Sequence, residues 1–293
     1  MQNTLKGRII KAISGFFYVD SDGLVYECRA RNFRRAGIKP VVGDIAEFQV
    51  LDEDKKLGNL VDIEDRKNVL VRPAVANVDQ ALVVFQVADP RPNLYLLDRF
   101  LVMMSYSNVP VVIVFSKSDL VSDEEVEGLA AIYSGEYRVI LTSVRDGRGI
   151  DEVRALLEDG LTTIAGPSGA GKSSLINELQ SQVLMETGEI SKKLQHGRNT
   201  TRHSQLIAVG SGYIIDTPGF STMFLPELKS GELEQHFPEM TGPSGKCRFI
   251  GCSHKAEPDC GVKVAVREGR IAESRYESYV RMYDELKDIE NTY

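Results

Sequence analysis

A glycine-rich segment in the second half of the chain has the residue types and spacing of a phosphate-binding loop. Residues 166–173 read Gly-Pro-Ser-Gly-Ala-Gly-Lys-Ser, which fits the pattern of Gly, four residues, Gly, Lys and then Ser or Thr. The apolar run 161–165 before it predicts a buried strand, and residues 174–180 after it predict a helix. In that context backbone N–H groups and the helix N-terminus face an anion. The alternative is a glycine-rich turn, and we interpret the segment as a nucleoside-triphosphate site.

Two side chains of this loop carry specific chemistry. Lys172 is expected to reach the β- and γ-phosphates, where it acts on the developing charge, and the Ser173 hydroxyl is expected to bind Mg²⁺. The remaining loop residues, and the one that follows, are expected to contact the nucleotide: Gly166, Pro167, Ser168, Gly169, Ala170, Gly171 and Ser174.

Asp216 and Gly219 follow the predicted strand 213–215 in the order Asp-Thr-Pro-Gly. An Asp at a strand end can hold Mg²⁺ through water, and the glycine N–H can meet the γ-phosphate. Alone, Asp-x-x-Gly is more often a β-turn. Its place about forty residues after the phosphate loop, at the end of a buried strand, favours the nucleotide role.

Residues 116–119, Ser-Lys-Ser-Asp, follow the predicted strand 111–115 and approximate the Asn/Thr-Lys-x-Asp signature that reads guanine. The Asp119 carboxylate would accept hydrogen bonds from guanine N1 and N2, the Lys117 stem would pack on the base, and Ser116 would take the first position. Adenine would leave that carboxylate unpaired. A polar turn is the alternative. A second segment, Thr142-Ser143-Val144, resembles the weak element whose backbone touches the guanine oxygen, so Ser143 and Val144 join the predicted site.

The chain order of these motifs differs from that of ordinary GTPases, in which the phosphate loop precedes the guanine signature. Here guanine recognition comes first and Asp216 comes last, which predicts a circularly permuted sheet. The polar stretch 188–203 contains Thr200-Thr201-Arg202, which we interpret as the first switch, with the Thr201 hydroxyl completing the Mg²⁺ shell. A flexible loop is the alternative, and both descriptions can hold together.

A second kind of chemistry is predicted near the C-terminus. Three cysteines and a histidine occur within fourteen residues, with the spacing Cys-x4-Cys-x-His-x5-Cys, at Cys247, Cys252, His254 and Cys260. Three thiolates and an imidazole make a closed tetrahedral Zn²⁺ site, which is structural rather than catalytic. Accidental clustering is the alternative.

The elements that position these residues predict a multidomain α/β protein. Residues 1–67 contain five short β-prone runs and predict a small barrel of the oligonucleotide-binding type. Residues 68–229 alternate strands and helices, as in a doubly wound, mainly parallel sheet around a P-loop GTPase site. Residues 230–293 predict a zinc-binding helical domain. In its last helix Tyr276, Tyr279, Val280 and Tyr283 have the spacing of one packed face.

Composition limits the possible partners. The 293 residues are 42% hydrophobic and 26% charged, with a net charge of −7, which argues against non-specific coating of nucleic acid. A local basic segment remains, because Arg29, Arg31, Arg34, Arg35 and Lys39 surround Phe33 without an acid from 28 to 43. This pattern suits RNA and equally a solvated loop. The N-terminus lacks a signal-peptide core and no apolar run could span a bilayer, so we expect a cytoplasmic protein.

This combination resembles the bacterial ribosome-small-subunit-dependent GTPases, the RsgA/YjeQ/YloQ group, over essentially the whole chain. Further matching segments are Arg72-Pro73, 76–80, Leu97-Asp98-Arg99-Phe100-Leu101 and 261–279. The resemblance implies a GTPase that hydrolyses GTP to GDP and phosphate, binds the 30S subunit late in its maturation and is released on hydrolysis. It also implies stimulation by the 30S subunit, contacts of the barrel and zinc domain with 16S rRNA, and a monomer that needs Mg²⁺ and one Zn²⁺.

The sequence departs from the family pattern at two positions, and from that of Ras-like enzymes at a third. Ser116 stands where Asn is usual, Asn199 stands where relatives often carry a histidine proposed to act in hydrolysis, and Phe220 follows Gly219 where Ras-like enzymes have glutamine. Asn199 is therefore an open candidate for a catalytic role, and slow intrinsic hydrolysis is expected. The competing hypotheses are an ATP-dependent P-loop enzyme and a non-catalytic rRNA-binding module that uses nucleotide as a fold ligand.

Overall fold

The computed structural model describes residues 4–30, 33, 37–71, 74–187, 205–216 and 225–292, with the backbone alone described at 181–187 and 216. Its contacts divide the chain into two compact units. One comprises Met1–Ala81, Val153–Ile164 and Ile176–Pro218, and the other Leu82–Glu152, Ala165–Leu175 and Gly219–Tyr293. Among the described residues, no helix is long and apolar enough to cross a membrane.

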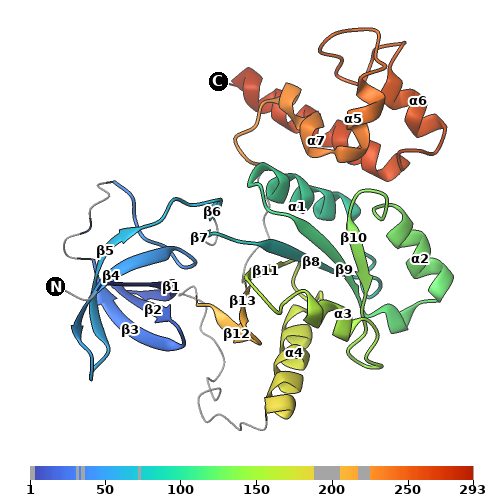
Figure 1. The fold of residues 1–293 in the computed structure, drawn as a ribbon. Coiled ribbons are helices and arrows are strands. Elements are labelled where there is room, and N and C mark those ends of the chain that lie inside the picture. Colours follow the sequence, from blue (N-terminus) through green and yellow to red (C-terminus); the bar gives the residue numbers. More distant parts are fainter. Residues whose placement is uncertain are drawn as a thin grey trace. The chain divides into compact units, whose positions relative to one another are not determined.

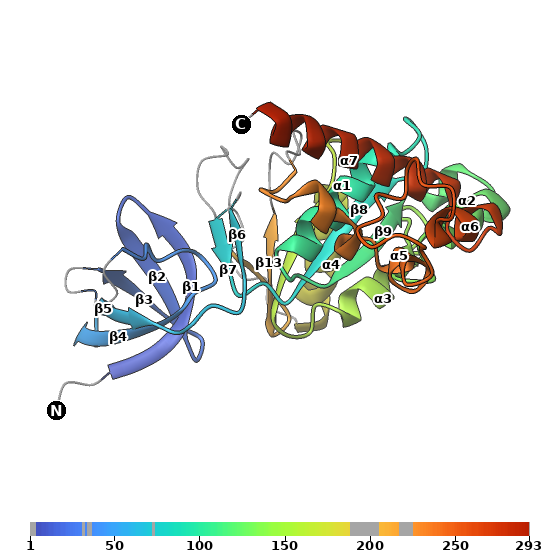
Figure 2. The same ribbon diagram turned by 90° about the horizontal axis from the view of Figure 1, so that it is seen from above.

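The first five strands close into the predicted barrel, in the order β1-β2-β3-β5-β4 (Figure 2). They are β1 (Thr4–Ile13), β2 (Phe16–Ser21), β3 (Leu24–Arg29), β4 (Ile45–Asp52) and β5 (Leu57–Ile63). Asp22 and Gly23 join β2 to β3 with φ of 52° and 81°. Two successive positive φ angles match the twist of the strands, which is why an Asp-Gly pair between two β-prone runs predicts a hairpin. Alternate residues fill the barrel core: Ile9, Phe17, Val19, Tyr26, Cys28, Ala46, Phe48, Leu60 and Ile63.

A short hairpin that was not predicted follows the barrel. Strands β6 (Val69–Val71) and β7 (Ala74–Ala76) pair antiparallel, and Val75 bridges to Val42 of the barrel segment. Three residues are too few for an alternating pattern to be read.

Six strands form the predicted sheet, in the order β10-β9-β8-β11-β13-β12 (Figure 1). They are β8 (Gln80–Gln86), β9 (Val111–Ser116), β10 (Arg138–Leu141), β11 (Leu161–Ala165), β12 (Ile207–Val209) and β13 (Gly212–Asp216). The pairs β9–β10 and β11–β13 are parallel, whereas β12–β13 is antiparallel. Strands β8 and β11 are almost wholly buried, as expected for sheet strands covered on both faces.

Helices begin where the sequence offers caps. The Asn93 side chain accepts the Leu96 N–H at the start of α1 (Leu94–Tyr106), and Ser122 accepts the Glu125 N–H at the start of α2 (Asp123–Ala131). The capping box Ser122-Asp123-Glu124-Glu125 in the sequence predicts a helix through Tyr133, but the helix ends at Ala131 and turns follow it. The other helices here are η1 (Ser118–Leu120), α3 (Ile150–Ala155) and α4 (Lys172–Thr187).

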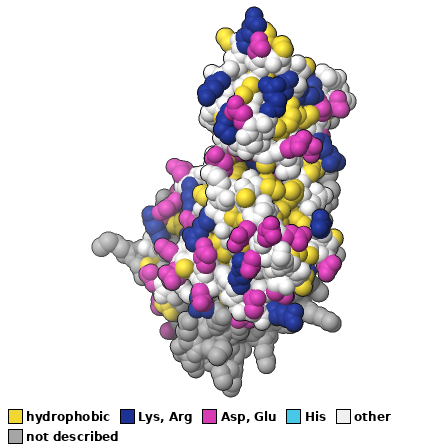
Figure 3. All heavy atoms as spheres, turned by 90° about the vertical axis from the view of Figure 1, so that its right-hand side faces the viewer, with side chains coloured by type: hydrophobic (Ala, Val, Ile, Leu, Met, Phe, Trp, Pro, Cys, Tyr) yellow, Lys and Arg dark blue, Asp and Glu magenta, His cyan; other side chains and the backbone are white. Residues whose placement is uncertain are grey.

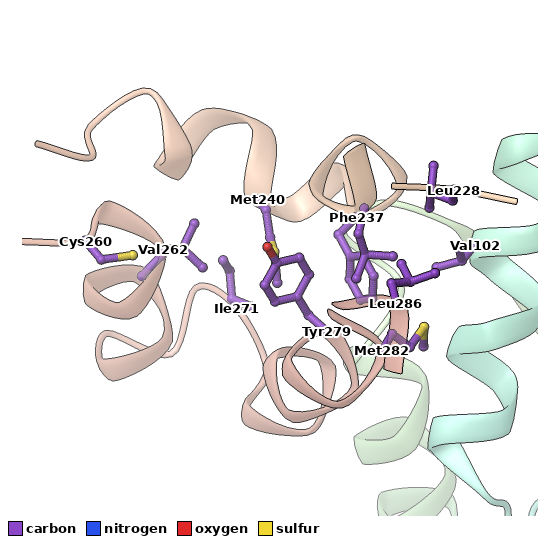
Figure 4. Close-up of a cluster of buried hydrophobic side chains, with 12 residues drawn as sticks. Val102, Leu228, Phe237, Met240, Cys260, Val262, Ile271, Tyr279, Met282 and Leu286 are labelled. Atoms are coloured by element: carbon purple, nitrogen blue, oxygen red, sulfur yellow. The ribbon is translucent and has the colours of Figure 1, made fainter. Parts of the chain in front are cut away.

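The C-terminal part is helical, with η2 (Ser230–His236), α5 (Pro238–Ser244), α6 (Gly261–Arg267) and α7 (Glu273–Thr292). Its core also receives Val102 from α1, which points toward Leu286 in Figure 4. Tyr279 is buried, and Tyr276, Val280 and Tyr283 pack against the same cluster, so the predicted face of the last helix is confirmed. The buried cluster is Val102, Leu228, Leu233, Phe237, Met240, Cys260, Val262, Ala265, Ile271, Tyr279, Met282 and Leu286.

Candidate functional site

The phosphate loop lies between β11 and α4, as the sequence predicted. Gly166 has a φ of 141°, and a Cβ there would lie 2.0 Å from the Val84 carbonyl oxygen, so no other residue fits. Gly171 has a φ of 82° and immediately precedes α4, whose first hydrogen bond runs from Leu175 N–H to Gly171 O at 2.9 Å. The loop tip at 168–169 is exposed. The N-terminus of α4 therefore adjoins the exposed loop tip, where an anion could bind.

The Lys172 ammonium group is folded back over the loop. Its Nζ donates to the Gly166 and Pro167 carbonyl oxygens at 2.8 Å each. The amine therefore already lies on the side of the loop where phosphate oxygens would replace these carbonyls. Ser173 is exposed at the start of α4, where a hydroxyl can reach a cation.

Ser116 joins the predicted guanine signature to the phosphate loop. Its Oγ donates a 2.6 Å hydrogen bond to the Ala170 carbonyl oxygen, and both residues are buried. A Cβ on Gly171 would lie 3.6 Å from the same Oγ. The serine hydroxyl thus fixes the distance between two segments 54 residues apart in the chain. The serine in place of asparagine still makes a hydrogen bond that holds the site together.

The two predicted base-recognition segments are also tied together by backbone hydrogen bonds. The Thr142 N–H donates to Phe115 O at 2.8 Å, and the Ser118 N–H donates to Thr142 O at 3.0 Å. Lys117 adopts a left-handed conformation with φ 57°. This bend turns the chain from β9 into η1, which carries Asp119. Both segments therefore lie at the carboxyl ends of neighbouring parallel strands, where nucleotides bind in open α/β sheets.

Asp119 is the carboxylate expected to read guanine, and its side chain is 16% exposed. Arg145 Nη1 lies 3.8 Å from its Oδ2, and Arg145 is mostly exposed. Ser143 is buried and accepts the Asp146 N–H at 3.4 Å, whereas Val144 is exposed. The arginine was not predicted as part of the site, since only folding brings it beside the carboxylate.

Several predicted residues lie outside the described residues. These are Asn199, Thr201 and Gly219, together with the segment 188–203 and Phe220. The side chain of Asp216 is likewise not described, although its backbone pairs with Ile164 across β13 and β11. The assigned roles of these residues remain predictions. The same holds for Arg31, Arg34 and Arg35 of the basic segment.

The three cysteines and the histidine of the C-terminal domain come together as predicted, with all four ligand atoms within 4.8 Å of one another. Cys247 Sγ lies 3.9 Å from Cys260 Sγ, and His254 Nδ1 lies 3.5 Å and 3.4 Å from these two sulfurs. A tetrahedral Zn²⁺ with bonds of about 2.3 Å to sulfur and about 2.0 Å to nitrogen needs S···S near ~3.8 Å and N···S near ~3.5 Å. The donor set and its spacing therefore fit a tetrahedral metal ion.

A carboxylate outside the cluster orients the histidine ligand. Glu234 Oε2 lies 2.9 Å from His254 Nε2, so the opposite ring nitrogen, Nδ1, faces the sulfurs. A hydrogen bond from a metal-bound histidine to a carboxylate fixes the tautomer and strengthens the ligand. The N–H groups of Gly261 and Lys263 donate to the sulfurs of Cys247 and Cys260. Glu234 was missed because it precedes the motif by thirteen residues and lies on a different element, η2.

Without a cation the thiols of Cys252 and Cys260 would stay protonated. Burial raises the pKa of Cys252 to about 12 and also raises the pKa of Cys260. A bound divalent cation would displace these protons, because the thiolate is the metal ligand. The cluster is thus built for a metal rather than for free thiol chemistry.

Comparison with known proteins agrees with this arrangement. The RsgA GTPase family model matches residues 63–226, and the RsgA N-terminal domain model matches residues 6–58. The small ribosomal subunit biogenesis GTPase RsgA of Agathobacter rectalis is 50% identical, over 97% of this chain and 99% of that protein. The protein of the same name from Alkaliphilus metalliredigens is 46% identical, over 96% and 98%.

Two solved structures share the whole architecture. YjeQ from Thermotoga maritima superposes with a TM-score of 0.83 at 36% identity, covering 97% of this chain and 99% of that chain. YloQ, described as a circularly permuted GTPase, has a TM-score of 0.81 at 35% identity, covering 98% and 96%. The permuted order inferred from the motifs is thus the order found in these structures. Because the resemblance spans both domain models and nearly the full length of its relatives, the chain belongs to the RsgA family of GTPases and is a GTP-hydrolysing enzyme.

Proposed function

We propose that this protein is a late-stage maturation factor of the small ribosomal subunit. It binds the 30S subunit with GTP, the 30S subunit stimulates hydrolysis, and GDP formation accompanies release. The names of the relatives, which describe small ribosomal subunit biogenesis GTPases, support this proposal. Such a factor works in the cytoplasm, and we propose that it acts as a monomer.

One observation carries the nucleotide part of the proposal, namely the 2.6 Å hydrogen bond from Ser116 to the phosphate loop. This contact between the two segments supports a single site that would hold both the guanine base and the phosphates. Asp119 would accept two hydrogen bonds from guanine, and Lys172 would exchange the loop carbonyls for β- and γ-phosphate oxygens. Backbone N–H groups of the loop would hold the remaining phosphate charge.

The cation and the switch residues complete the proposed site. Ser173, Thr201 and Asp216 would surround Mg²⁺, directly or through water, and Mg²⁺ neutralises charge on the phosphates. The Gly219 N–H would meet the γ-phosphate, and Asn199 is the candidate for positioning the attacking water. With no confident general base among these residues, hydrolysis would be slow until the 30S subunit orders the switch.

We propose that 16S rRNA is bound by both the barrel and the C-terminal domain. On the barrel, Arg29 lies 4.4 Å from the Phe16 ring centre, and Lys11 lies 5.4 Å from that of Tyr18. Each pair joins cross-strand neighbours, which gives a cationic and aromatic face of the kind that stacks on bases.

The C-terminal domain offers a second such surface. Phe249 is half exposed and Ile250 fully exposed, and Arg248 lies over the Phe249 ring. On the face drawn in Figure 3, Lys and Arg side chains lie close to hydrophobic ones in the upper part, with Asp and Glu side chains among them. The cations of this region are Lys246, Arg248, Lys255, Lys263, Arg267 and Arg270. Between residues 246 and 270 these six cations outnumber the three acids Glu257, Asp259 and Glu268, of which Asp259 pairs with Arg248 and Glu268 with Arg270. The positive charge is confined to this segment, and its excess there supports contact with phosphate.

We further propose that the resident metal of the Cys247, Cys252, His254 and Cys260 cluster is Zn²⁺ and that it is structural, because four protein ligands leave no open position. The division into a barrel at 1–67, a GTPase domain at 68–229 and a zinc domain at 230–293 belongs to the same proposal.

The testing experiment measures hydrolysis of GTP and of ATP by the purified protein, with and without 30S subunits. Stimulation that is specific to GTP and to the 30S subunit supports the proposal. Tight GTP binding with no stimulation would refute the ribosome-linked part and leave the guanine site intact. Equal use of ATP would refute the role of Asp119.

A further inference from the structure

The C-terminal domain is anchored to the GTPase domain by a buried charged cluster. Arg275 of α7 is 2% exposed, and its Nη1 donates to Asp98 Oδ1 of α1 at 2.5 Å. Its Nε donates to Glu239 Oε1 of α5 at 2.6 Å. The guanidinium also lies 4.6 Å from the Phe237 ring centre and 5.5 Å from that of Tyr133. Arg275 is 177 residues from Asp98 in the chain, and it binds α1 through the fully buried carboxylate of Asp98.

This cluster is not what a merely stabilising contact would require. Asp98 Oδ2 and Arg275 Nη2 are buried and have no hydrogen-bond partner among the described residues. Buried charges that are incompletely paired cost stability compared with apolar side chains of the same volume. The same two helices are already held together by Arg99 with Glu285 and by apolar packing around Val102. A costly cluster in an interface with other anchors suggests a role beyond adhesion.

The cluster continues toward the nucleotide site through Tyr133. The Tyr133 hydroxyl donates to Asp98 Oδ1 at 3.0 Å, so one carboxylate oxygen binds both the C-terminal arginine and this tyrosine. The Tyr133 ring packs on Phe115, with ring centres 6.2 Å apart. Phe115 accepts the Thr142 N–H through its carbonyl and directly precedes Ser116, which is bonded to the phosphate loop. Every step of this path is a contact between buried groups.

We propose that Asp98 and Tyr133 are positioning residues that couple the C-terminal domain to the guanine-recognition strand β9. When a partner binds the C-terminal domain and displaces Arg275, the Asp98 side chain moves with it. Tyr133 then transmits this movement to Phe115 at the end of β9. The consequence is a change in how Ser116 and the phosphate loop hold nucleotide. The proposal rests on the proposed function in one respect: the 30S subunit is taken as the partner that binds the C-terminal domain.

The test removes one hydroxyl from this path. Tyr133→Phe keeps the ring on Phe115 and the cation over its face but deletes the hydrogen bond to Asp98. The control is Tyr26→Phe, because Tyr26 of the barrel is equally buried and its hydroxyl also donates to a carboxylate, that of the exposed Glu53 in the turn between β4 and β5. A thermal unfolding scan and metal content establish that both variants are folded. The kinetic readout is kcat and KM for GTP, each with and without 30S subunits.

We expect Tyr133→Phe to keep its intrinsic kcat and its affinity for 30S subunits, and to lose about fivefold or more of the 30S stimulation of kcat, which is the lower end of ordinary coupling energies. The Tyr26→Phe control should be stimulated like the wild type. Wild-type stimulation in Tyr133→Phe would overturn the proposal. So would an equal loss in both variants, because that result reports general destabilisation.

A second variant separates this proposal from the proposed function. If 30S subunits do not stimulate the wild-type protein, the ribosome-linked function fails, and coupling is then read from the dissociation rate of fluorescent GDP in the absence of any partner. Arg275→Met retains the apolar stem and deletes the charge at the far end of the path. A change of about fivefold or more in GDP release, absent from Tyr26→Phe, supports coupling, since this is the lower end of ordinary coupling between sites. An unchanged rate in a folded Arg275→Met protein refutes it.

Discussion

Replacing Ser116 with alanine tests the bond that joins the two halves of the nucleotide site. The change removes one oxygen atom and leaves the Cβ in place, so packing around the end of β9 hardly alters. The lost interaction is the 2.6 Å hydrogen bond to the Ala170 carbonyl oxygen. Ala170 is fully buried, so its carbonyl would be left without this donor.

The magnitude follows from that burial. A hydrogen bond between neutral groups contributes about 1 kcal/mol net, and a buried acceptor left unpaired costs about 1–3 kcal/mol. A loss of about 1–2 kcal/mol corresponds to roughly a 5–30-fold change in an equilibrium constant. We expect this change of roughly 5–30-fold in the dissociation constant for nucleotide, because a loop without its bond to Ser116 must be ordered again when phosphate binds. Any part of this free energy that already stabilises the nucleotide-free protein is also lost, and that part lowers the midpoint temperature of unfolding.

Ser118→Ala provides a matched control two residues away. Ser118 is as deeply buried as Ser116, but its Oγ has no hydrogen-bond partner within the part of the chain that the structure describes. Deleting that hydroxyl removes a buried polar group without breaking a bond, so affinity for GDP should stay within about twofold of the wild type.

The assay is titration of nucleotide-free protein with fluorescent GDP, together with a thermal unfolding scan. Weaker binding by Ser116→Ala alone is the expected result. If both alanine variants bind GDP like the wild type and unfold at the same temperature, the bond to Ala170 does not organise the loop. Equal weakening in both variants would show that any loss of polarity at this turn is harmful, and the specific argument would fail.

Three further predictions concern other parts of the chain. Glu234→Gln should leave the four ligands in place and lower metal affinity by about 10–100-fold. Competition with a chelator measures this affinity, and an unchanged value would count against the orienting role of Glu234. A double alanine change at Lys172 and Ser173 should abolish GTP turnover, and wild-type rates from it would exclude the phosphate-loop assignment. Hydrogen bonds from the Ser230 N–H, and then from Lys287, lower the pKa of Glu290 to about 2 from its ordinary 4.5. Because this folded-state pKa lies below the unfolded one, its stabilisation is complete above about pH 4.5 and is lost as pH falls toward 2, so Glu290→Gln should flatten acid unfolding in that window; an identical pH profile would contradict it.

The sequence alone determined those features whose residues are close together in the chain. The phosphate loop could be read because its glycines, lysine and serine act within eight consecutive residues, and the positive φ at Gly166 and Gly171 favours glycine there. The metal cluster could be read for the same reason, since four ligands within fourteen residues meet after one compact turn of chain. The hairpin at Asp22-Gly23 likewise depends on local backbone preference.

Only the tertiary structure decided which distant groups meet. That Ser116 would bond Ala170, that Glu234 would orient His254, and that Arg275 would share Asp98 with Tyr133 cannot be read from spacing, because these partners come from different elements. Each is a polar side chain that must find a partner once burial removes it from water. Asp98 lies among apolar residues of α1 and is fully buried. Which cation neutralises it depends on how α7 packs on α1, and that packing is set by long-range apolar contacts such as Val102 with the C-terminal core.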